Sequence, residues 1–249
     1  MKTSFLTVAA VLAAATVARA FDITTCYQTV QRGEEGVLQA DLACDGSGGP
    51  NVDVERGGKL LLNGHTISGG YLGIATGHGA GGKAVIEGPG EITGASGDGN
   101  PYGCGISALS KTVVRNVSIR GNRCGISSYY EFTVTLEGVQ VTENTDDGVS
   151  TAGSGPGGGR IKAEDTTVSN NGGTGILSPS IVTGRSLTVV GNGAGGVSGK
   201  RVSLVDSTLS GNGPGGDVRS PTRPRLRGSS CETSVNSADG STWGVCSLD

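Results

Sequence analysis

The amino-acid sequence predicts an all-β solenoid, a single chain wound into a parallel β-helix of about six or seven coils with a cap at each end. Asparagines recur at intervals of 22, 27, 21 and 20 residues, and each lies a few positions before a glycine-containing pair such as Gly125-Ile126. Apolar residues recur at fixed positions before each asparagine. A period near twenty residues with short apolar alternation between turn residues is typical of a solenoid. The repeated asparagines are Asn122, Asn144, Asn171, Asn192 and Asn212.

The apolar positions divide each repeat into short strands. Residues three and five positions before the asparagine are mostly apolar, and a step of two marks a strand with one buried face. A further step of three, as in Leu136-Glu137-Gly138-Val139, marks a bend. Each repeat is therefore expected to contain a strand, a bend, a strand, an asparagine turn and a strand, in coils stacked about 4.8 Å apart. The residues three positions before the asparagines are Ile119, Val141, Val168, Val189 and Leu209.

The repeated asparagine is expected to form the turn and to join neighbouring coils. Asparagine tolerates turn geometry, including left-handed conformations, and hydrogen-bonds to nearby backbone. In a stack, each side-chain amide is expected to donate to one neighbouring coil and to accept from the other. A disordered Gly-rich chain is the alternative, since 47 of the 249 residues are glycine. The fixed spacing of asparagine and apolar residues argues against disorder.

Residues 1–20 are expected to be a secretory signal peptide. Lys2 begins this segment, an apolar run follows, and Ala18-Arg19-Ala20 matches a small-x-small cleavage pattern. A short membrane anchor is the alternative, but the apolar run is too short to span a bilayer. The mature chain is therefore expected to begin at Phe21 and to be secreted to the extracellular space.

An extracellular location makes the six cysteines candidates for disulfides, for which fifteen pairings are possible. Cys104 and Cys124 each directly precede a Gly-Ile pair, so they are expected to stack on adjacent coils at a separation that suits a disulfide. The other four cysteines bracket the segments before and after the repeats. Metal binding is the alternative, but no CxxC or CxxH spacing is present, and no metal or cofactor is predicted. The simplest local pairing is Cys26–Cys44, Cys104–Cys124 and Cys231–Cys246.

The regions flanking the repeats are expected to cap the solenoid. An open end exposes unpaired backbone and apolar core, which another segment must cover. Residues 21–55 are interpreted as the N-terminal cap, with one strand at 37–42, and residues 56–217 as the β-helix. Residues 218–249 are interpreted as a disulfide-closed C-terminal cap, where prolines disfavour strand pairing.

Several of these features together resemble a known family. A Cys-bracketed lead, a Leu-rich strand running into Asn63-Gly64-His65-Thr66-Ile67, and recurring Asn…Gly-Ile coils are similar to secreted right-handed parallel β-helix proteins of the pectin-lyase-like superfamily. The resemblance covers residues 21–217 and implies a right-handed helix. Members include pectate lyases, polygalacturonases and alginate epimerases, so the resemblance implies a polysaccharide as substrate or ligand. The sequence has no counterpart of a calcium-binding Asp cluster with a lyase arginine, nor of an Asp-Pro-His segment.

Charged residues seven positions before the asparagines are the candidate catalytic group. In aligned coils they form one outward column in which two carboxylates lie about 4.8 Å apart. Retaining glycosidases use a similar separation, about 5 Å, and such closeness raises the pKa of one carboxyl. The alternative is a surface ladder in which Arg115 faces Glu137 and Arg185 faces Glu164, each pair contributing about 0–1 kcal/mol. The ladder is favoured because no aromatic residue flanks the column. The column contains Arg115, Glu137, Glu164 and Arg185, followed by Val205.

Other residues give weaker signals. His65 is interpreted as a structural histidine rather than a catalytic one. Asp146-Asp147 form an acidic turn that is solvated or, as the alternative, holds Ca²⁺. The tail arginines grip an acidic polymer or lie in a solvated loop, and the second interpretation is favoured. His78 has no obvious partner, and the tyrosines near the coil loops stack on a saccharide or pack against the coil edge. The arginines are Arg219, Arg223, Arg225 and Arg227, and the tyrosines are Tyr102, Tyr129 and Tyr130.

Two function classes follow. In the first, the protein binds extracellular or cell-surface polysaccharide, or is structural, without turnover. In the second, it is a lyase, hydrolase or epimerase acting on an acidic glycan. The first is favoured because no catalytic constellation stands out. The net charge of −3 indicates neither nucleic-acid binding nor membrane attachment, and a monomer is expected.

Overall fold

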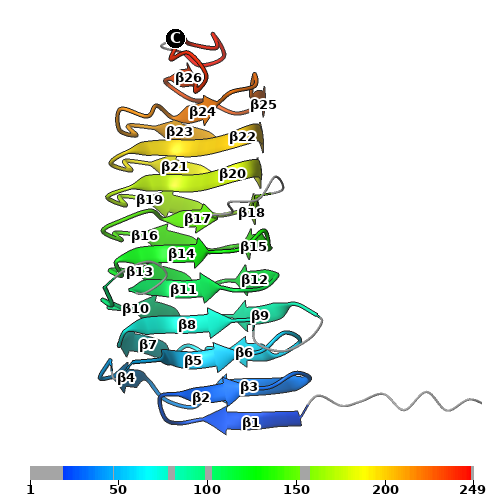
Figure 1. The fold of residues 1–249 in the computed structure, drawn as a ribbon, viewed down its shortest axis with the longest axis vertical. Coiled ribbons are helices and arrows are strands. Elements are labelled where there is room, and N and C mark those ends of the chain that lie inside the picture. Colours follow the sequence, from blue (N-terminus) through cyan, green and yellow to red (C-terminus); the bar gives the residue numbers. More distant parts are fainter. Residues whose placement is uncertain (1–18, 47, 78–81, 99–102, 152–157, 248–249) are drawn as a thin grey trace, which may run out of the picture.

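The computed structural model describes residues 19–46, 48–77, 82–98, 103–151 and 158–247. In these ranges the chain forms 26 β-strands and no α-helix, and every pairing between the strands is parallel. Most coils contribute three strands, and the coils stack into one long column (Figure 1). The predicted all-β parallel solenoid is therefore confirmed.

The first stack of strands, face A, extends over the whole height of the column. Val52, Ile74 and Ile106 pair in sequence here and point inward at 0% exposure. The long strands β20 and β22 run through a corner and contribute to two faces. The strands of face A are β2 Gln28–Val30, β5 Pro50–Val54, β8 Leu72–Thr76, β11 Cys104–Ala108, β14 Cys124–Ser128, β17 Val149–Thr151, the first parts of β20 Thr174–Arg185 and β22 Gly195–Val205, β24 Val218–Ser220 and β26 Ser234–Asn236.

The second stack, face B, follows face A in each coil and carries the charged column. Its inward residues, such as Leu136 and Leu204, are fully buried, while the residues between them face outward. Its strands are β1 Arg19–Ile23, β3 Glu34–Leu38, β6 Lys59–Leu61, β9 Ala84–Glu87, β12 Thr112–Arg115, β15 Thr133–Glu137, β18 Arg160–Glu164, the second parts of β20 and β22, and β25 Arg225–Arg227.

The third stack, face C, is a separate eight-stranded sheet of short strands. From β10 to β23 the central residue of each strand points into the core, and from β13 on it is the apolar residue three positions before the asparagine; β4 and β7 bury Leu42 and Ile67. Its strands are β4 Leu42–Cys44, β7 Thr66–Gly69, β10 Glu91–Thr93, β13 Ser118–Arg120, β16 Gln140–Thr142, β19 Thr167–Ser169, β21 Thr188–Val190 and β23 Thr208–Ser210.

The predicted asparagine ladder is present. Asn144 Nδ2 donates to Asn171 Oδ1 at 2.9 Å, and Asn171 Nδ2 donates to Asn192 Oδ1 at 2.9 Å. Asn122 and Asn212 extend the ladder at its two ends. The four asparagines from Asn122 to Asn192 are each 1% exposed, so the buried amides have their partners in neighbouring coils.

The left-handed residues of the turns are not the ladder asparagines. Positive φ occurs one position before the ladder asparagine, as at Glu143 and Asn170, and six positions before it, as at Asn116 and Asp206. The expectation that the ladder asparagine itself supplies left-handed geometry is therefore wrong. Its side chain is occupied with coils on both sides, and the preceding residue makes the turn.

The three predicted disulfides are confirmed. The Cα–Cα separations are 6.0 Å for Cys26–Cys44, 4.4 Å for Cys104–Cys124 and 4.9 Å for Cys231–Cys246. Cys104 and Cys124 are register partners on β11 and β14, as their equal spacing from Gly-Ile predicts. In the described part of the chain, no helix has the length and apolar character that a membrane crossing requires.

Parallel pairing extends beyond the expected limits of the repeat. β1 pairs with β3 and β4 pairs with β7, so the segment expected to be an N-terminal cap already forms coils. At the other end β25 pairs with β22, because Pro221 and Pro224 lie in the turn before this strand rather than within it. The eight strands of face C alone exceed the expected six or seven coils. Residues 1–18 of the expected signal peptide lie outside the described residues.

Candidate functional site

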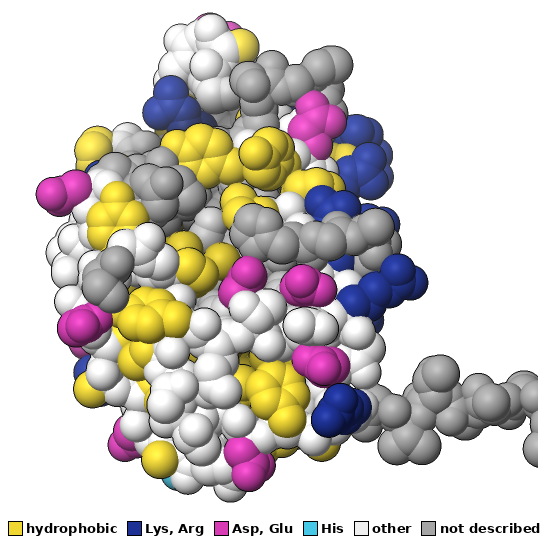
Figure 2. Space-filling view, turned by 60° about the horizontal axis from the view of Figure 1, so that its bottom comes forward, with side chains coloured by type: hydrophobic (Ala, Val, Ile, Leu, Met, Phe, Trp, Pro, Cys, Tyr) yellow, Lys and Arg dark blue, Asp and Glu magenta, His cyan; other side chains and the backbone are white. Residues whose placement is uncertain are grey.

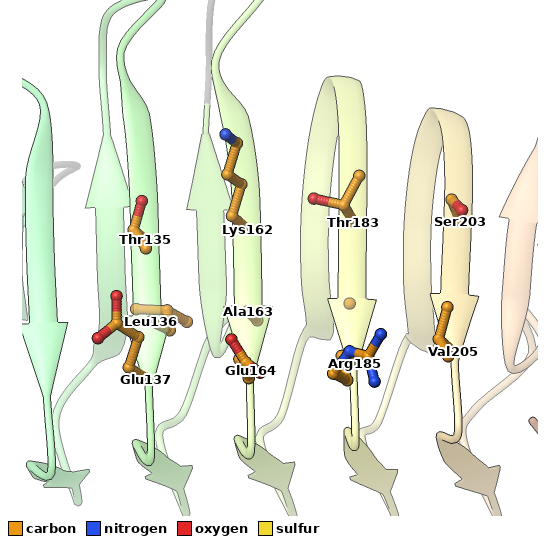
Figure 3. A pocket seen from close by; sticks show the side chains of 11 residues that line it. Thr135, Leu136, Glu137, Lys162, Ala163, Glu164, Thr183, Arg185, Ser203 and Val205 are labelled. Atoms are coloured by element: carbon orange, nitrogen blue, oxygen red, sulfur yellow. The ribbon is translucent and has the colours of Figure 1, made fainter.

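The charged column predicted from the sequence is aligned on the outer surface of face B. Arg115 pairs in register with Glu137, Glu137 with Glu164, and Glu164 with Arg185. Val205 follows on β22 and Arg227 on β25. Figure 3 shows Glu137, Glu164, Arg185 and Val205 as one row, beside a second row formed by Thr135, Lys162, Thr183 and Ser203.

Glu137 is held by Arg115. Arg115 Nε donates to Glu137 Oε2 at 2.6 Å, and Nη2 donates to Oε1 at 3.4 Å, which is a two-pronged contact. These hydrogen bonds from Arg115 lower the pKa of Glu137, and the same contact raises the pKa of Arg115. Glu137 is therefore ionised at neutral pH and directed toward β12, away from Glu164.

Glu164 and Arg185 do not form the second ion pair that the surface ladder predicts. Arg185 Nη1 lies 4.0 Å from Asp206 Oδ2, because Asp206 directly follows Val205, the register partner of Arg185. Within the described part of the chain, the Glu164 carboxylate has no hydrogen bond or ion pair. The two glutamates are thus neighbours with different environments: one is paired, and the other faces solvent.

Toward the N-terminus, Lys59 and Arg115 on the outer surface of face B have carboxylate partners. Lys59 Nζ lies 3.3 Å from Glu35 Oε2 and 3.1 Å from Glu87 Oε2, on the strands before and after it. Hydrogen bonds to these two carboxylates oppose the burial that would lower the pKa of Lys59, and its pKa is raised. With the Arg115–Glu137 pair, each cation in the outward register of β6 and β12 has a carboxylate partner.

Toward the C-terminus, the same surface carries cations without such partners. Three adjoining hollows extend from β15 to β25, and Ser203 lies at the wall of all three. We call this surface the basic groove and define it by its six exposed cations. Apart from the long Arg185–Asp206 contact, none of them has an ion-pair partner among the described residues. The cations are Lys162, Arg185, Arg201, Arg223, Arg225 and Arg227.

The basic groove is a local concentration of charge on an acidic protein. The chain has 19 Lys and Arg against 22 Asp and Glu. Figure 2, which brings the N-terminal end forward, shows that basic side chains lie mostly on the right side of the molecule, without resolving the groove itself. This is the side on which β18 and β25 lie in Figure 1. Three of the four tail arginines identified in the sequence belong to the groove, whereas Arg219 lies on face A. Lys162 and Arg201 were not predicted as site residues from the sequence, because neither belongs to the tail or to the column seven positions before the asparagines.

The remaining sequence candidates lie away from this surface. His65 Nδ1 is 3.3 Å from Asp41 Oδ1, in a turn, which is consistent with its structural interpretation. Tyr129 and Tyr130 are 43% and 58% exposed. Next to them, Arg56 lies 5.0 Å from the centre of the Phe132 ring. His78 and Tyr102 lie outside the described residues.

The acidic turn is divided between two roles. Asp146 Oδ2 accepts a hydrogen bond from Arg123 Nε at 3.1 Å. Asp147 Oδ1 accepts one from the Thr174 backbone N–H at 2.8 Å, and burial raises the pKa of this carboxyl. Among the described residues no group of three or more His, Cys, Asp or Glu side chains is arranged to hold a metal ion.

The fold and its repeats identify the class of protein. A family model described as a right-handed β-helix region matches residues 30–194, which is more than half of the chain. The chain belongs to this family, and the match gives the helix its right-handed sense. No curated protein and no solved structure matches the chain significantly.

Proposed function

We propose that the protein binds an extracellular polysaccharide along the basic groove without cleaving it. The observation that carries this proposal is the row of exposed, unpaired cations over adjoining hollows. Small-molecule sites enclose most of their ligand, whereas this groove is open along its length, as a polymer requires. Its strands offer equivalent contact positions about every 4.8 Å, so successive sugar units meet a repeating surface.

The walls of the groove offer hydrogen bonds suited to sugars. Thr183 and Ser203 present hydroxyl groups between the charged rows, and Thr222 lies beside Arg223. Hydroxyls both donate and accept, and guanidinium groups donate in a fixed fork, so both can bind hydroxyl and acidic groups of a glycan. The family membership and the three disulfides are consistent with a secreted protein, which we propose acts as a monomer.

The environment of Glu137 favours binding over turnover. A retaining mechanism needs one carboxyl that stays protonated until it acts, and Arg115 lowers the pKa of Glu137 instead. Glu164 is the observation in favour of the second candidate, a carbohydrate-active enzyme, because its carboxylate is unpaired beside Glu137. The two candidates share a polysaccharide ligand and differ in whether it is cleaved.

One experiment tests both candidates. The mature protein is incubated with pectate, alginate and neutral glucans, with and without Ca²⁺, while binding is measured by affinity electrophoresis and products by reducing-end and ultraviolet-absorbance assays. We expect retardation by at least one polymer and no product. Product that disappears in the Glu137→Gln or Glu164→Gln variant would establish the enzyme. Absence of binding to every polymer would refute the proposed function.

A further inference from the structure

We infer that the polysaccharide is a polyanion, bearing carboxylate or sulfate groups, that it lies along the helix axis, and that Glu164 marks one end of its footprint. This inference rests on the proposed function and specifies the ligand of the same groove. Three observations support it: the unpaired cations, the direction of the groove and the reversal of charge within it.

The unpaired cations point to an anionic ligand. Cations on neighbouring strands repel one another, and in the N-terminal half of face B the carboxylates of Glu35, Glu87 and Glu137 pair with Lys59 and Arg115. No comparable carboxylates accompany Arg201, Arg223 and Arg225 in the described structure. Each guanidinium can donate two parallel hydrogen bonds, and their spacing matches the two oxygens of a carboxylate or of a sulfate. A polyanion therefore supplies the counter-charges that the protein itself provides elsewhere on this face.

The groove is longest along the helix axis. The outward register from Glu137 through Glu164, Arg185 and Val205 to Arg227 crosses five strands. At about 4.8 Å between strands, this row spans about 19 Å, and Arg185 and Arg227 are about 10 Å apart along the axis. A polymer lying in this direction meets cations from β18 to β25, whereas one crossing it meets mainly those of β25.

The sign of the charge reverses at one end of the groove. Lys162 on β18 and Arg185 on β20 are its first cations. Glu164 lies two positions after Lys162 on β18 and is the register partner of Arg185. Because the Glu164 carboxylate is exposed and has no partner in the described structure, it repels an anionic polymer that extends toward β15. Arg115 is already occupied by Glu137, so no free cation continues the row beyond Glu164.

The test compares the affinity of the mature protein for three polymers: polygalacturonate, dextran sulfate and neutral dextran. The variant Arg201→Gln/Arg225→Gln removes two groove charges, and Lys111→Gln/Arg219→Gln removes two exposed charges outside the groove as its control. The third variant, Glu164→Gln, removes the repelling carboxylate. All of these positions are exposed, and circular dichroism and thermal unfolding check that each variant folds.

We expect the groove variant to lose about tenfold or more in affinity for the anionic polymer, and the control about twofold or less. Glu164→Gln is expected to gain about threefold, a change that partial unfolding cannot produce. Increasing salt should weaken binding by the native protein more steeply than binding by the groove variant. The groove variant neutralises fewer polymer charges and therefore releases fewer counterions when it binds. A preference for polygalacturonate or for dextran sulfate identifies carboxylate or sulfate as the bound group.

Different outcomes overturn the inference and the proposed function. Equal binding of neutral dextran, an equal loss in both double variants, or weaker binding by Glu164→Gln would overturn the inference while leaving polysaccharide binding intact. Failure to bind all three polymers would overturn both. Tighter binding to duplex DNA or to anionic phospholipid vesicles than to any polysaccharide would show a different class of ligand and would also overturn both.

Discussion

Asn171 illustrates how one side chain joins three coils. Its Oδ1 accepts from the backbone N–H and the side-chain Nδ2 of Asn144, at 3.1 and 2.9 Å. Its Nδ2 donates to the Val141 carbonyl at 3.1 Å and to Asn192 Oδ1 at 2.9 Å. A buried group that loses such partners keeps the cost of desolvation. The ladder therefore stabilises the stacking of coils as well as the turn.

The first prediction concerns this ladder. Asn171→Ala removes the acceptor of the Asn144 backbone N–H and Nδ2 and the donor to the Val141 carbonyl, so it should lower the free energy of unfolding by about 1–3 kcal/mol. Ser169→Ala, two positions earlier at a half-buried site, is the matched control and should change it by less than about 0.5 kcal/mol. Denaturant unfolding measures both. An Asn171→Ala effect no larger than that of the control would contradict the ladder.

The second prediction concerns Glu137. Because Arg115 lowers the folded-state pKa, the pair contributes stability above the unfolded pKa and loses it as pH falls through the folded pKa. The contribution should be about 0–1 kcal/mol, since both side chains are more than a third exposed. NMR titration should show Glu137 below the ordinary glutamate value, and Arg115→Gln should return it toward that value. A pKa of Glu137 above the ordinary range would instead support the catalytic pair.

At the scale of elements, the cross-coil disulfide reinforces a place where face A is already paired. Cys104 and Cys124 are register partners on β11 and β14, beside the buried Leu72 and Ala75. The disulfide closes a 20-residue separation, one full coil. It therefore restrains the unfolded chain over the same length that forms one repeat.

The third prediction concerns this disulfide. Replacing both cysteines by alanine should lower the free energy of unfolding by about 3 kcal/mol, the chain-entropy value for a loop of this size. Reversible denaturation measures the loss, and mass spectrometry of unreduced peptides should find Cys104 linked to Cys124. Free, alkylatable thiols at both positions in the native protein would contradict the pairing.

The strands that sequence analysis could and could not predict differ in their turns. Val141, Val168 and Val189 are each three positions before a ladder asparagine, so this fixed spacing predicted their strands. Leu42, Ile67 and Ile92 stack in the same register of face C, but no ladder asparagine follows them. Ile67 and Ile92 lie within the β-helix predicted from residue 56, whereas Leu42 lies in the segment interpreted as the N-terminal cap, although all three share the same parallel pairing.

The candidate site was predictable in its register but not in its contacts. Strand alternation places Glu137, Glu164 and Arg185 in one outward row, as the position seven before the asparagine predicts. Lys162 is two positions before Glu164, at the next outward position of the same strand, so the alternation of the strand also predicts that it faces outward. The choice of Asp206 rather than Glu164 by Arg185 depends on side-chain conformation, which the spacing does not determine.

At the scale of the whole molecule, the pairing of charges on face B changes along the helix axis. On face B, Lys59 of β6 and Arg115 of β12 have carboxylate partners, whereas the cations of the basic groove from β18 to β25 have only the long Arg185–Asp206 contact. The stacked parallel strands hold these side chains in register, about 4.8 Å apart from one strand to the next. The net charge of −3 thus conceals a basic surface that only the folded arrangement creates.

The measurement that most directly tests polymer binding at this groove follows the arginine side chains during ligand addition. Oligomers of galacturonate are titrated into isotopically labelled protein, and the Nε–Hε signals of all arginines are recorded by NMR. We expect the largest shifts at Arg185, Arg201, Arg223, Arg225 and Arg227, with little change at Arg115 and Arg120, which are held by Glu137 and Glu91. Largest shifts at Arg123 or Arg219, with the groove arginines unchanged, would contradict the account.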